Sequence, residues 1–592
     1  MVKRIISSVL VGCMLAGALC VGVRNDVAKI GNMSSTEAAV SSAGVETGGE
    51  SRIKGAESGT SSIENDDDNT MVCDGAVMSN PMPPLNIIDD KYRNFYEIFL
   101  YSYYDSNGDG IGDIQGLISK LDYLNDGDDT TDSDLGVNGI WLMPVAQSTT
   151  YHKYDVVDYM SIDTEYGTLD DFKQLVDECH ARGINVIIDM VINHSSSQND
   201  WFLQATDYIK GLNGKEPSVE ECPYFDYYNF TKEKVGNIHC QVGDTDWYYE
   251  AQFWSEMPDI NLESDLVREE FAKITQFWFD LGVDGFRLDA VGEYYSGQTG
   301  RSVEVLTWFN DMVKQQKKDA YLVGEAWDVL ETYSQFYASG IDSMFNFDYA
   351  THTGIIANTV KKVNGCNAAV FGKRLENLTA DFSQYNENYI DAPFYTNHDT
   401  GRSAGYYSGD YSPAQTKIAG AMNLFMSGAS FIYYGEELGM KGAGKDENKR
   451  AGMLWYEDKT TEGMCKGPEN MDKIKMKYGS LEEQQNDPDS IYNYYKKVIR
   501  YKNAYPEIAR GTVDFIEEIS TEDICVITKQ YNEEFITIVY NISENVNEVN
   551  LAESALADLG LEICGTLLTC DGEIVLEDNK IQMQPYSVVL LR

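Results

Sequence analysis

The stretch NVIIDMVINH at residues 185–194 and the stretch GFRLD at residues 285–289 decide the fold. Each is a short, mostly apolar run that ends in ionisable side chains. Such runs are typical of strands buried on both faces of a parallel sheet. A charge at the end of a buried strand is costly unless it is paired or used, so these ends mark a candidate site.

The same pattern continues on both sides of these stretches. We expect further strands at residues 95–101, 139–143, 321–324, 394–396 and 431–434, with a weaker one near 342–347. Amphipathic helices lie between them, opened by a capping box at Thr168, by Ser264 and by Ser412-Pro413. Alternating strands and helices of this number predict a closed (β/α)8 TIM barrel of the α/β class, whose chemistry lies at the C-terminal ends of the strands.

Changes in composition predict the domain boundaries. We expect the catalytic barrel over residues 85–506, with a subdomain rich in Tyr, Asp and Asn, about 195–255, inserted after the third strand. A loop of that length is usually functional. Apolar runs at 524–529, 535–540 and 587–591 predict a C-terminal antiparallel β domain over 507–592.

The N-terminus predicts export. Lys3 and Arg4 precede an uncharged stretch over 5–23, the order of a secretory signal, and we assign 1–32 as the export segment. Its residues Leu10 to Cys13 resemble the lipobox of bacterial lipoproteins, which leaves two alternatives: free secretion, or a membrane tether through lipidated Cys13. We expect residues 33–84 to form a polar, disordered linker. The expected location is extracellular or at the cell surface.

The overall charge excludes some partners. The 592 residues include 46 Lys plus Arg against 95 Asp plus Glu, a formal net charge of −49. Nucleic-acid binding depends on Lys and Arg displacing counterions from phosphates, so a nucleic acid is excluded as a partner. With 43% hydrophobic residues, the chain has enough apolar side chains to bury large cores.

Two further strand ends add to the candidate site. Glu325 follows residues 321–324, and His398 with Asp399 follows 394–396. Alternation along a strand places Arg287 and Asp289 on one side, and all these groups converge at one barrel mouth. Carboxylates with an Arg, and without a Cys or His cluster of metal spacing, fit two-carboxylate acid and nucleophile chemistry better than metal hydrolysis.

These motifs, in this order, resemble the four conserved regions of the α-amylase family, glycoside hydrolase family 13. The resemblance spans roughly residues 85–592 and implies a retaining mechanism, with Asp289 as nucleophile, Glu325 as general acid and base, and Asp399 binding the distorted sugar. It further implies that three residues contact the nucleophile or the sugar: His194, Arg287 and His398. By general rule the two reacting carboxyls of a retaining enzyme lie about 5 to 5.5 Å apart.

The segment 105–113 predicts a structural Ca²⁺ site. Its sequence DSNGDGIGD places oxygen ligands at alternate positions, which suits a hard cation, although an EF-hand would have Glu where this chain has Gly116. The segment resembles the calcium loop of oligo-1,6-glucosidase-like members of the family. That resemblance implies as ligands Asp105, Asn107, Asp109, Asp113 and the carbonyl of Ile111.

Finer motifs bear on the substrate. Residues 151–155 resemble the family's sugar-stacking segment, with His152 and Tyr154 lining the subsite on the non-reducing side. Exo-acting relatives carry Asp at the place of Tyr151, which grips a terminal glucose together with an Arg at the place of Arg450. Because that Asp is missing, we expect an open cleft and internal attack on α-1,4 bonds of starch and related α-glucans.

Subgroup features leave alternatives open. Ala290 matches α-1,4-acting relatives, and residues 257–261 look intermediate between the oligo-1,6-glucosidase and neopullulanase forms. Gly292-Glu293 departs from the Lys-His that many amylases carry there, so the subsite on the leaving-group side is not assigned. The alternatives are a maltodextrin-acting α-glucosidase or transglycosylase, and a non-catalytic glycan-binding or transporter-associated relative.

Overall fold

The computed structural model describes residues 91–592. The expected export segment at 1–32, with Cys13, and the linker at 33–84 lie outside the described residues. Among residues 91–592, no helix has the length and apolar character needed to cross a bilayer.

A parallel sheet of eight strands forms the centre of the described chain. From β1 to β12, each barrel strand pairs with the next one along the chain, and β1 also pairs with β13. A parallel bridge between Phe394 and Phe431 joins the remaining edges, so the predicted (β/α)8 fold is confirmed. The strands are β1 (Asn94–Ile98), β2 (Gly139–Leu142), β5 (Asn185–Met190), β9 (Gly285–Leu288), β10 (Tyr321–Gly324), β11 (Ser343–Phe345), β12 (Ile390–Ala392) and β13 (Ser430–Tyr433).

The seventh barrel strand differs from the expectation. We predicted it at residues 394–396, but β12 ends at Ala392, and Phe394 contributes only the closing bridge. The cause is Pro393, which lacks an N–H and cannot continue the ladder as a donor. Its carbonyl still accepts a hydrogen bond of 2.9 Å from the N–H of Phe431.

Helices connect the barrel strands, and their ends follow the sequence signals. Thr168 and Asp171 form the predicted capping box of α4, Ser264 caps α6, and Pro413 lies in the first turn of α11. The helices are α2 (Ile114–Ile118), α3 (Leu121–Leu124), α4 (Leu169–Ala181), α6 (Asp265–Asp280), α7 (Thr299–Gln316), α8 (Leu330–Tyr333), α9 (Ile355–Lys361), α10 (Ala368–Ser383), α11 (Ser412–Leu424), α12 (Asp446–Lys449), α13 (Leu481–Gln484), α14 (Ile491–Ala504) and α15 (Pro506–Arg510). The 3₁₀ turns among them are η2 (Leu100–Ser102), η4 (Val291–Glu293), η5 (Ser334–Ser339) and η6 (Ser403–Gly405).

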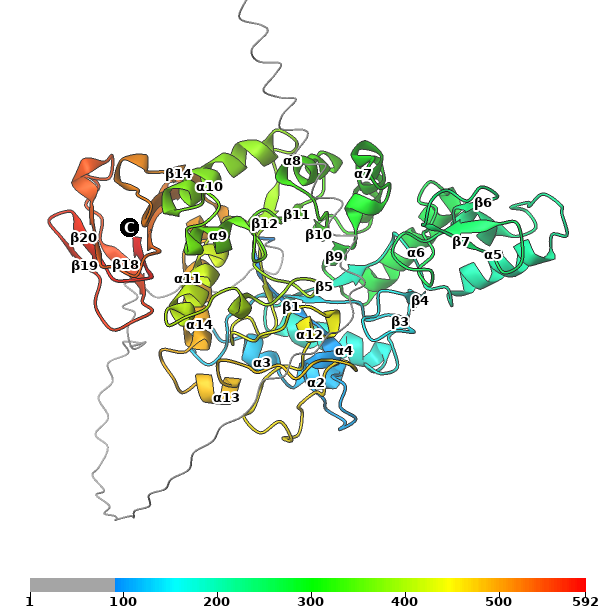
Figure 1. Ribbon diagram of the computed structural model, residues 1–592, viewed down its shortest axis with the longest axis horizontal. Coiled ribbons are helices and arrows are strands. Elements are labelled where there is room, and N and C mark those ends of the chain that lie inside the picture. The colour runs from blue at the N-terminus through cyan, green and yellow to red at the C-terminus, as the bar shows by residue number, and fades with distance from the viewer. Residues whose placement is uncertain (1–90) are drawn as a thin grey trace, which may run out of the picture. The chain divides into compact units, whose positions relative to one another are not determined.

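Two excursions lie between β2 and β9. A two-stranded ribbon, β3 (Gln147–Ser148) with β4 (Val156–Asp158), follows β2. After β5 come α5 (Asp200–Gly211), η3 (Pro223–Tyr227), β6 (Phe230–Thr231), β7 (His239–Gln241) and β8 (Tyr248–Glu250). Figure 1 shows β6 and β7 together beside α5, and a small core around Ile209, Val242 and Trp247 holds them.

The C-terminal segment is antiparallel, as predicted. Its strands are β14 (Thr512–Phe515), β15 (Ile524–Tyr531), β16 (Glu534–Asn541), β17 (Asn547–Asn550), β18 (Ile563–Leu567), β19 (Val575–Glu577), β20 (Lys580–Met583) and β21 (Ser587–Leu591), with turns η7 (Glu517–Ile519) and η8 (Leu551–Glu553). The buried ammonium of Lys529 on β15 donates to the carbonyl oxygens of Ile508, at 2.7 Å, and of Phe425, at 2.5 Å. These bonds tie the sheet to the helix ends of the barrel.

Candidate active site

Arg287 is the centre of the candidate site. It lies on β9, is fully buried, and its Nη1 donates to Asp189 Oδ1 at 2.8 Å and to Asp289 Oδ1 at 2.7 Å. Its Nη2 lies 3.1 Å from Glu325 Oε2. One guanidinium thus gathers carboxylates from the ends of β5, β9 and β10. Without it, three buried like charges would repel one another.

Glu325 is held as a buried acid. It directly follows β10, and only 8% of its surface is exposed. Burial raises its pKa to about 7, which outweighs the opposing effect of Arg287, and the neighbouring Asp289 raises it further. A carboxyl with such a pKa is about half protonated at pH 7, and the protonated form can donate a proton.

The turn after Asp289 aims a backbone donor at Glu325. Ala290 has the left-handed conformation, with φ 50° and ψ 41°. This conformation costs a non-glycine residue about 1–2 kcal/mol. In it, the Ala290 N–H donates to Glu325 Oε2 at 3.1 Å, while Asp289 stays beside Arg287. The local strain therefore fixes the two carboxylates relative to each other.

His398 and Asp399 form a second charged pair at the mouth. His398 Nε2 lies 3.0 Å from Asp399 Oδ2, and Arg450 Nη2 lies 2.9 Å from Asp399 Oδ1. Burial alone would raise the pKa of Asp399, but His398 and Arg450 outweigh it and hold that pKa far below its usual range. Asp399 is therefore an anion with part of its surface open, able to accept hydrogen bonds from sugar hydroxyls.

Tyr154 joins the two charged groups. Its hydroxyl donates to Asp189 Oδ2 at 3.0 Å and lies 2.8 Å from His398 Nε2. Its ring stacks on that of His398, with centroids 5.5 Å apart. Tyr154 thereby connects the Arg287 cluster to the His398 pair.

The segment before β4 is shaped by buried charges. The Asp155 carboxylate accepts hydrogen bonds from the hydroxyls of three residues, Ser148, Thr149 and Thr150. Lys153 has φ 65°, and its buried ammonium lies 2.9 Å from Asp163. These contacts fix the turn that presents His152 and Tyr154.

His152 is uncharged at neutral pH. Burial and the nearby Arg450 lower its pKa to about 4. Its Nδ1 lies 3.2 Å from the Thr150 hydroxyl and accepts from the Tyr154 N–H at 3.2 Å. The ring proton is therefore on Nε2, where it can be donated.

His194 follows β5 and is buried. Burial lowers its pKa, and within residues 91–592 its Nε2 has no hydrogen-bond partner. Its ring lies against Phe253 of the inserted segment, with centroids 5.4 Å apart. Hydrogen bonds or ion pairs join the other predicted catalytic and substrate-binding residues, whereas His194 meets the cluster through the backbone of Tyr154 and through the charge of Asp289.

Three residues of the network were not among our predicted site residues: Glu97, Asp189 and Tyr151. Glu97 Oε1 lies 2.6 Å from His398 Nδ1, and the Tyr151 hydroxyl accepts from Arg450 Nη1 at 3.1 Å. The sequence does contain a signal for Glu97, because it is the charged residue of an otherwise uncharged strand. We identified the other site residues from charges at the ends of apolar strands, and the same rule applies to Glu97. No local pattern predicts the pairing of Tyr151 with a residue 299 positions later.

The predicted calcium loop lies between η2 and α2. The carboxylate of Asp105 accepts from the N–H groups of Gly108 and Gly110, each at 2.7 Å, and Asp113 caps α2. Asp105 and Asp113 are buried. Burial raises the pKa of the Cys465 thiol, and the negative charges of Asp105, Asp113 and Asp109 raise it further. The three carboxylates thus all act electrostatically on one thiol, and their oxygens are the donors that Ca²⁺ prefers.

Two observations weigh against a metal ion in this loop. Among residues 91–592 no group of three or more His, Cys, Asp or Glu side chains is arranged to hold a metal ion. The ammonium of Lys466 also donates to the Asp109 carbonyl at 2.8 Å, which brings a positive charge to the loop.

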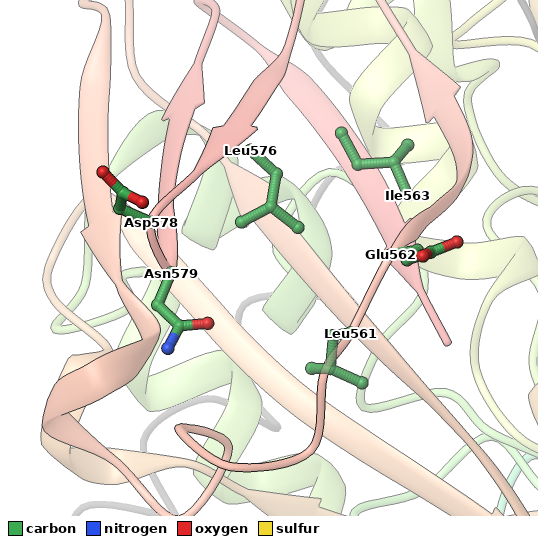
Figure 2. A pocket seen from close by; sticks show the side chains of 6 residues that line it. All are labelled: Leu561, Glu562, Ile563, Leu576, Asp578 and Asn579. Atoms are coloured by element: carbon green, nitrogen blue, oxygen red, sulfur yellow. The ribbon is translucent and has the colours of Figure 1, made fainter.

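A cleft in the C-terminal domain has carboxylates that do not converge. Figure 2 shows the Glu562 and Asp578 carboxylates pointing away from each other. The lining residues are Leu561, Glu562, Ile563, Leu576, Asp578 and Asn579. Carboxylates that do not converge cannot act together on one bond.

The barrel mouth therefore defines a class of enzyme. It pairs a buried carboxyl of raised pKa with a second carboxylate on one guanidinium, beside an anion open to solvent, and this is the arrangement of a two-carboxylate glycosidase. The model of the α-amylase catalytic domain matches residues 97–511. The chain belongs to the α-amylase family and is a glycoside hydrolase.

Similar proteins agree with this assignment. The chain is 34% identical to α-amylase 3 of Dictyoglomus thermophilum over 85% of this chain and 93% of that protein. It is 29% identical to an oligo-1,6-glucosidase of Parageobacillus thermoglucosidasius, over 76% and 89%. Among solved structures, Eubacterium rectale Amy13B is 47% identical, with a TM-score of 0.81 over 86% of this chain and 96% of that one.

Proposed function

We propose that the enzyme hydrolyses internal α-1,4-glucosidic bonds of starch and related α-glucans with retention of configuration. The observation that supports internal cleavage is the set of contacts that Arg450 makes. Its guanidinium is occupied by the Tyr151 hydroxyl and by Asp399, so it does not face an Asp at position 151 as in the exo-acting pattern. A cleft without that grip on a chain end accepts longer glucans.

The site residues supply a double displacement. Asp289, ion-paired to Arg287, attacks the anomeric carbon while Glu325 protonates the glycosidic oxygen, and the shortened glucan leaves. The carboxylate of Glu325 then takes a proton from water, whose oxygen attacks the same carbon and releases Asp289. The carboxylates of Asp289 and Asp399 stabilise the positive charge that develops on the sugar, Arg287 and His398 hold those carboxylates in place, and the neutral His152 and His194 donate to sugar hydroxyls.

Time-resolved chromatography of products tests the proposal. Soluble starch should give a spread of oligosaccharides before glucose accumulates, and NMR of the first products should show the α-anomer. The Glu325→Gln variant is the inactive control. Glucose as the sole early product would favour the maltodextrin-acting α-glucosidase, an alternative that the similarity to oligo-1,6-glucosidases supports. Lengthened oligosaccharides would favour transglycosylation.

We propose a structural Ca²⁺ in the 105–113 loop, held by the side chains of Asp105, Asn107, Asp109 and Asp113 and the Ile111 carbonyl. The ion would neutralise the buried carboxylates Asp105 and Asp113 and fix the start of α2. Chelation should lower the melting temperature, and added Ca²⁺ should restore it in the native protein but not in Asp105→Asn. An unchanged melting temperature after metal-free dialysis would mean that Lys466 supplies the charge instead.

We also propose that the enzyme is exported. The charged-then-apolar order of residues 1–32 supports an extracellular or cell-surface enzyme, free or tethered through Cys13. Mass spectrometry of the mature N-terminus distinguishes these forms, since a lipidated Cys13 adds acyl mass to the first residue. An unprocessed Met1 would contradict both.

A further inference from the structure

A buried carboxylate stands behind the candidate site. Glu97 lies on β1 and has 1% of its surface exposed. Its Oε1 accepts from the backbone N–H of His398 at 3.3 Å and lies 2.6 Å from His398 Nδ1. Because Glu97 is enclosed in the barrel wall, it acts on the sugar only through another residue.

The other side of the imidazole also meets an acid. His398 Nε2 lies 3.0 Å from Asp399 Oδ2 and 2.8 Å from the Tyr154 hydroxyl. The Trp141 ring on β2 faces the imidazole edge-on, with centroids 5.7 Å apart. Nδ1 thus faces a carboxylate, and Nε2 lies beside a second carboxylate and beside a hydroxyl that donates to Asp189, an arrangement that favours an imidazolium, with two N–H donors, over a neutral ring.

The charges around His398 come from several elements. Glu97 contacts it from β1 and Asp399 from its own segment, and Tyr154 faces it from the turn before β4. Behind these groups, Asp189 and Arg287 contact Tyr154, and Arg450 contacts Asp399. The cations therefore lie one group away, and the charged groups in direct contact with the imidazole are two carboxylates.

We infer that Glu97 is a positioning residue that keeps His398 doubly protonated, and that the charged imidazole in turn keeps Asp399 anionic and oriented toward the sugar. The inference rests on the proposed function, because the sugar-binding role of Asp399 supplies its readout. Burial alone lowers the pKa of His398, but Asp399 and Glu97 raise it to about 9, in keeping with this role.

A second buried glutamate provides a matched control. Glu437 follows β13 and is as deeply buried as Glu97, but its Oε1 accepts from the hydroxyls of Tyr96 and Tyr123, each at 2.7 Å. Burial raises the pKa of Glu437, whose Oε2 has no hydrogen-bond partner within residues 91–592. Glu437→Gln therefore repeats the chemical change in the same barrel without removing a charge beside His398.

The experiment combines histidine NMR with kinetics. Protein labelled with ¹⁵N-histidine has six His residues, and the His398→Gln spectrum assigns the His398 signals. At pH 8 the wild type and Glu437→Gln should show imidazolium shifts at both nitrogens of His398. Loss of a charge this close lowers a histidine pKa by about one to three pH units, here from about 9 to between about 8 and 6, so the His398 ring of Glu97→Gln should be at least half neutral at pH 8.

Activity on starch gives the second readout. The quantity to compare is the ratio of kcat/KM at pH 6 to kcat/KM at pH 8. This ratio should be at least fivefold larger in Glu97→Gln than in wild type, and in Glu437→Gln it should lie within twofold of the wild-type ratio. An imidazolium at pH 8 in Glu97→Gln, or an unchanged pH profile, overturns the inference.

The wild-type spectrum tests the inference without any variant, because a neutral His398 at pH 8 refutes it. Failure of the proposed function is distinguishable: a wild type that hydrolyses no α-glucan refutes that function, while the NMR measurement still decides the state of His398.

Discussion

The substitution Glu325→Gln separates proton donation from every other role of this side chain. Gln keeps the volume and can still accept the 3.1 Å hydrogen bond from the Ala290 N–H, but it cannot donate a proton from a carboxyl. At pH 6 a carboxyl with a pKa of about 7 is roughly 90% protonated, against roughly 3% for the ordinary value of 4.5. The buried site thus raises the fraction of the acid form about thirtyfold.

We expect the variant to lose about 10²- to 10⁴-fold in kcat/KM on starch, or about 3–5 kcal/mol of transition-state stabilisation. The loss should depend on the leaving group. With α-maltotriosyl fluoride, fluoride departs without protonation, so formation of the glycosyl enzyme should slow less than tenfold. The intermediate should then accumulate, because Glu325 is also the base that activates water.

Stopped-flow release of fluoride measures the first step, and added azide measures the second. Azide needs no base, so it should restore turnover of Glu325→Gln and yield an α-glycosyl azide. The control is Glu436→Gln, since burial raises the pKa of Glu436 to about 7 too, but its carboxylate bonds to Thr396 and Tyr495. Equal losses on starch and on the fluoride, without azide rescue, would refute the assignment of Glu325 as acid and base.

Three further predictions follow from the same contacts. The kcat/KM on starch should fall as pH rises through about 7, because only the protonated form of Glu325 donates; a pH series that stays flat to pH 9 would contradict this. Arg287→Met should cost about 3–5 kcal/mol in unfolding free energy at pH 8, measured by denaturant titration, and less at pH 5, where the stranded carboxylates protonate; equal losses would be inconsistent with the ion-pair cluster. Tyr151→Asp should raise the share of glucose among early starch products and Tyr151→Phe should not, so identical product profiles would dismiss the role of Arg450 in choosing the cleavage mode.

The sequence predicted the barrel because its strands are short, apolar and end in charge. Parallel strands share an edge, so Arg287, Glu325 and Asp399 had to meet if the strands paired in order. The error at 394–396 has a local cause, the missing N–H of Pro393. The pattern rule identified an apolar run but did not weigh the proline that ends the ladder.

Other parts of the site had no local signal. The partners of Arg450 come from positions 151 and 399, and only closure of the barrel brings them together. The sequence likewise gives the types of the two reacting carboxyls but not the burial of Glu325, which sets its pKa. Packing determines these properties, and periodicity and spacing do not report packing.

The geometry also supports the proposal that Glu325, and not Asp289, is the acid. Both carboxylates contact the same guanidinium, but Arg287 Nη1 donates a well-formed hydrogen bond of 2.7 Å to Asp289, whereas Nη2 only approaches Glu325 at ion-pair distance. The remaining donor to Glu325 is a neutral backbone N–H, which stabilises a carboxylate less than a cation does. Burial outweighs Arg287 at Glu325 and raises its pKa, while Asp289 keeps the shorter bond to the cation, and this asymmetry supports the proposed division into a proton donor and a nucleophile.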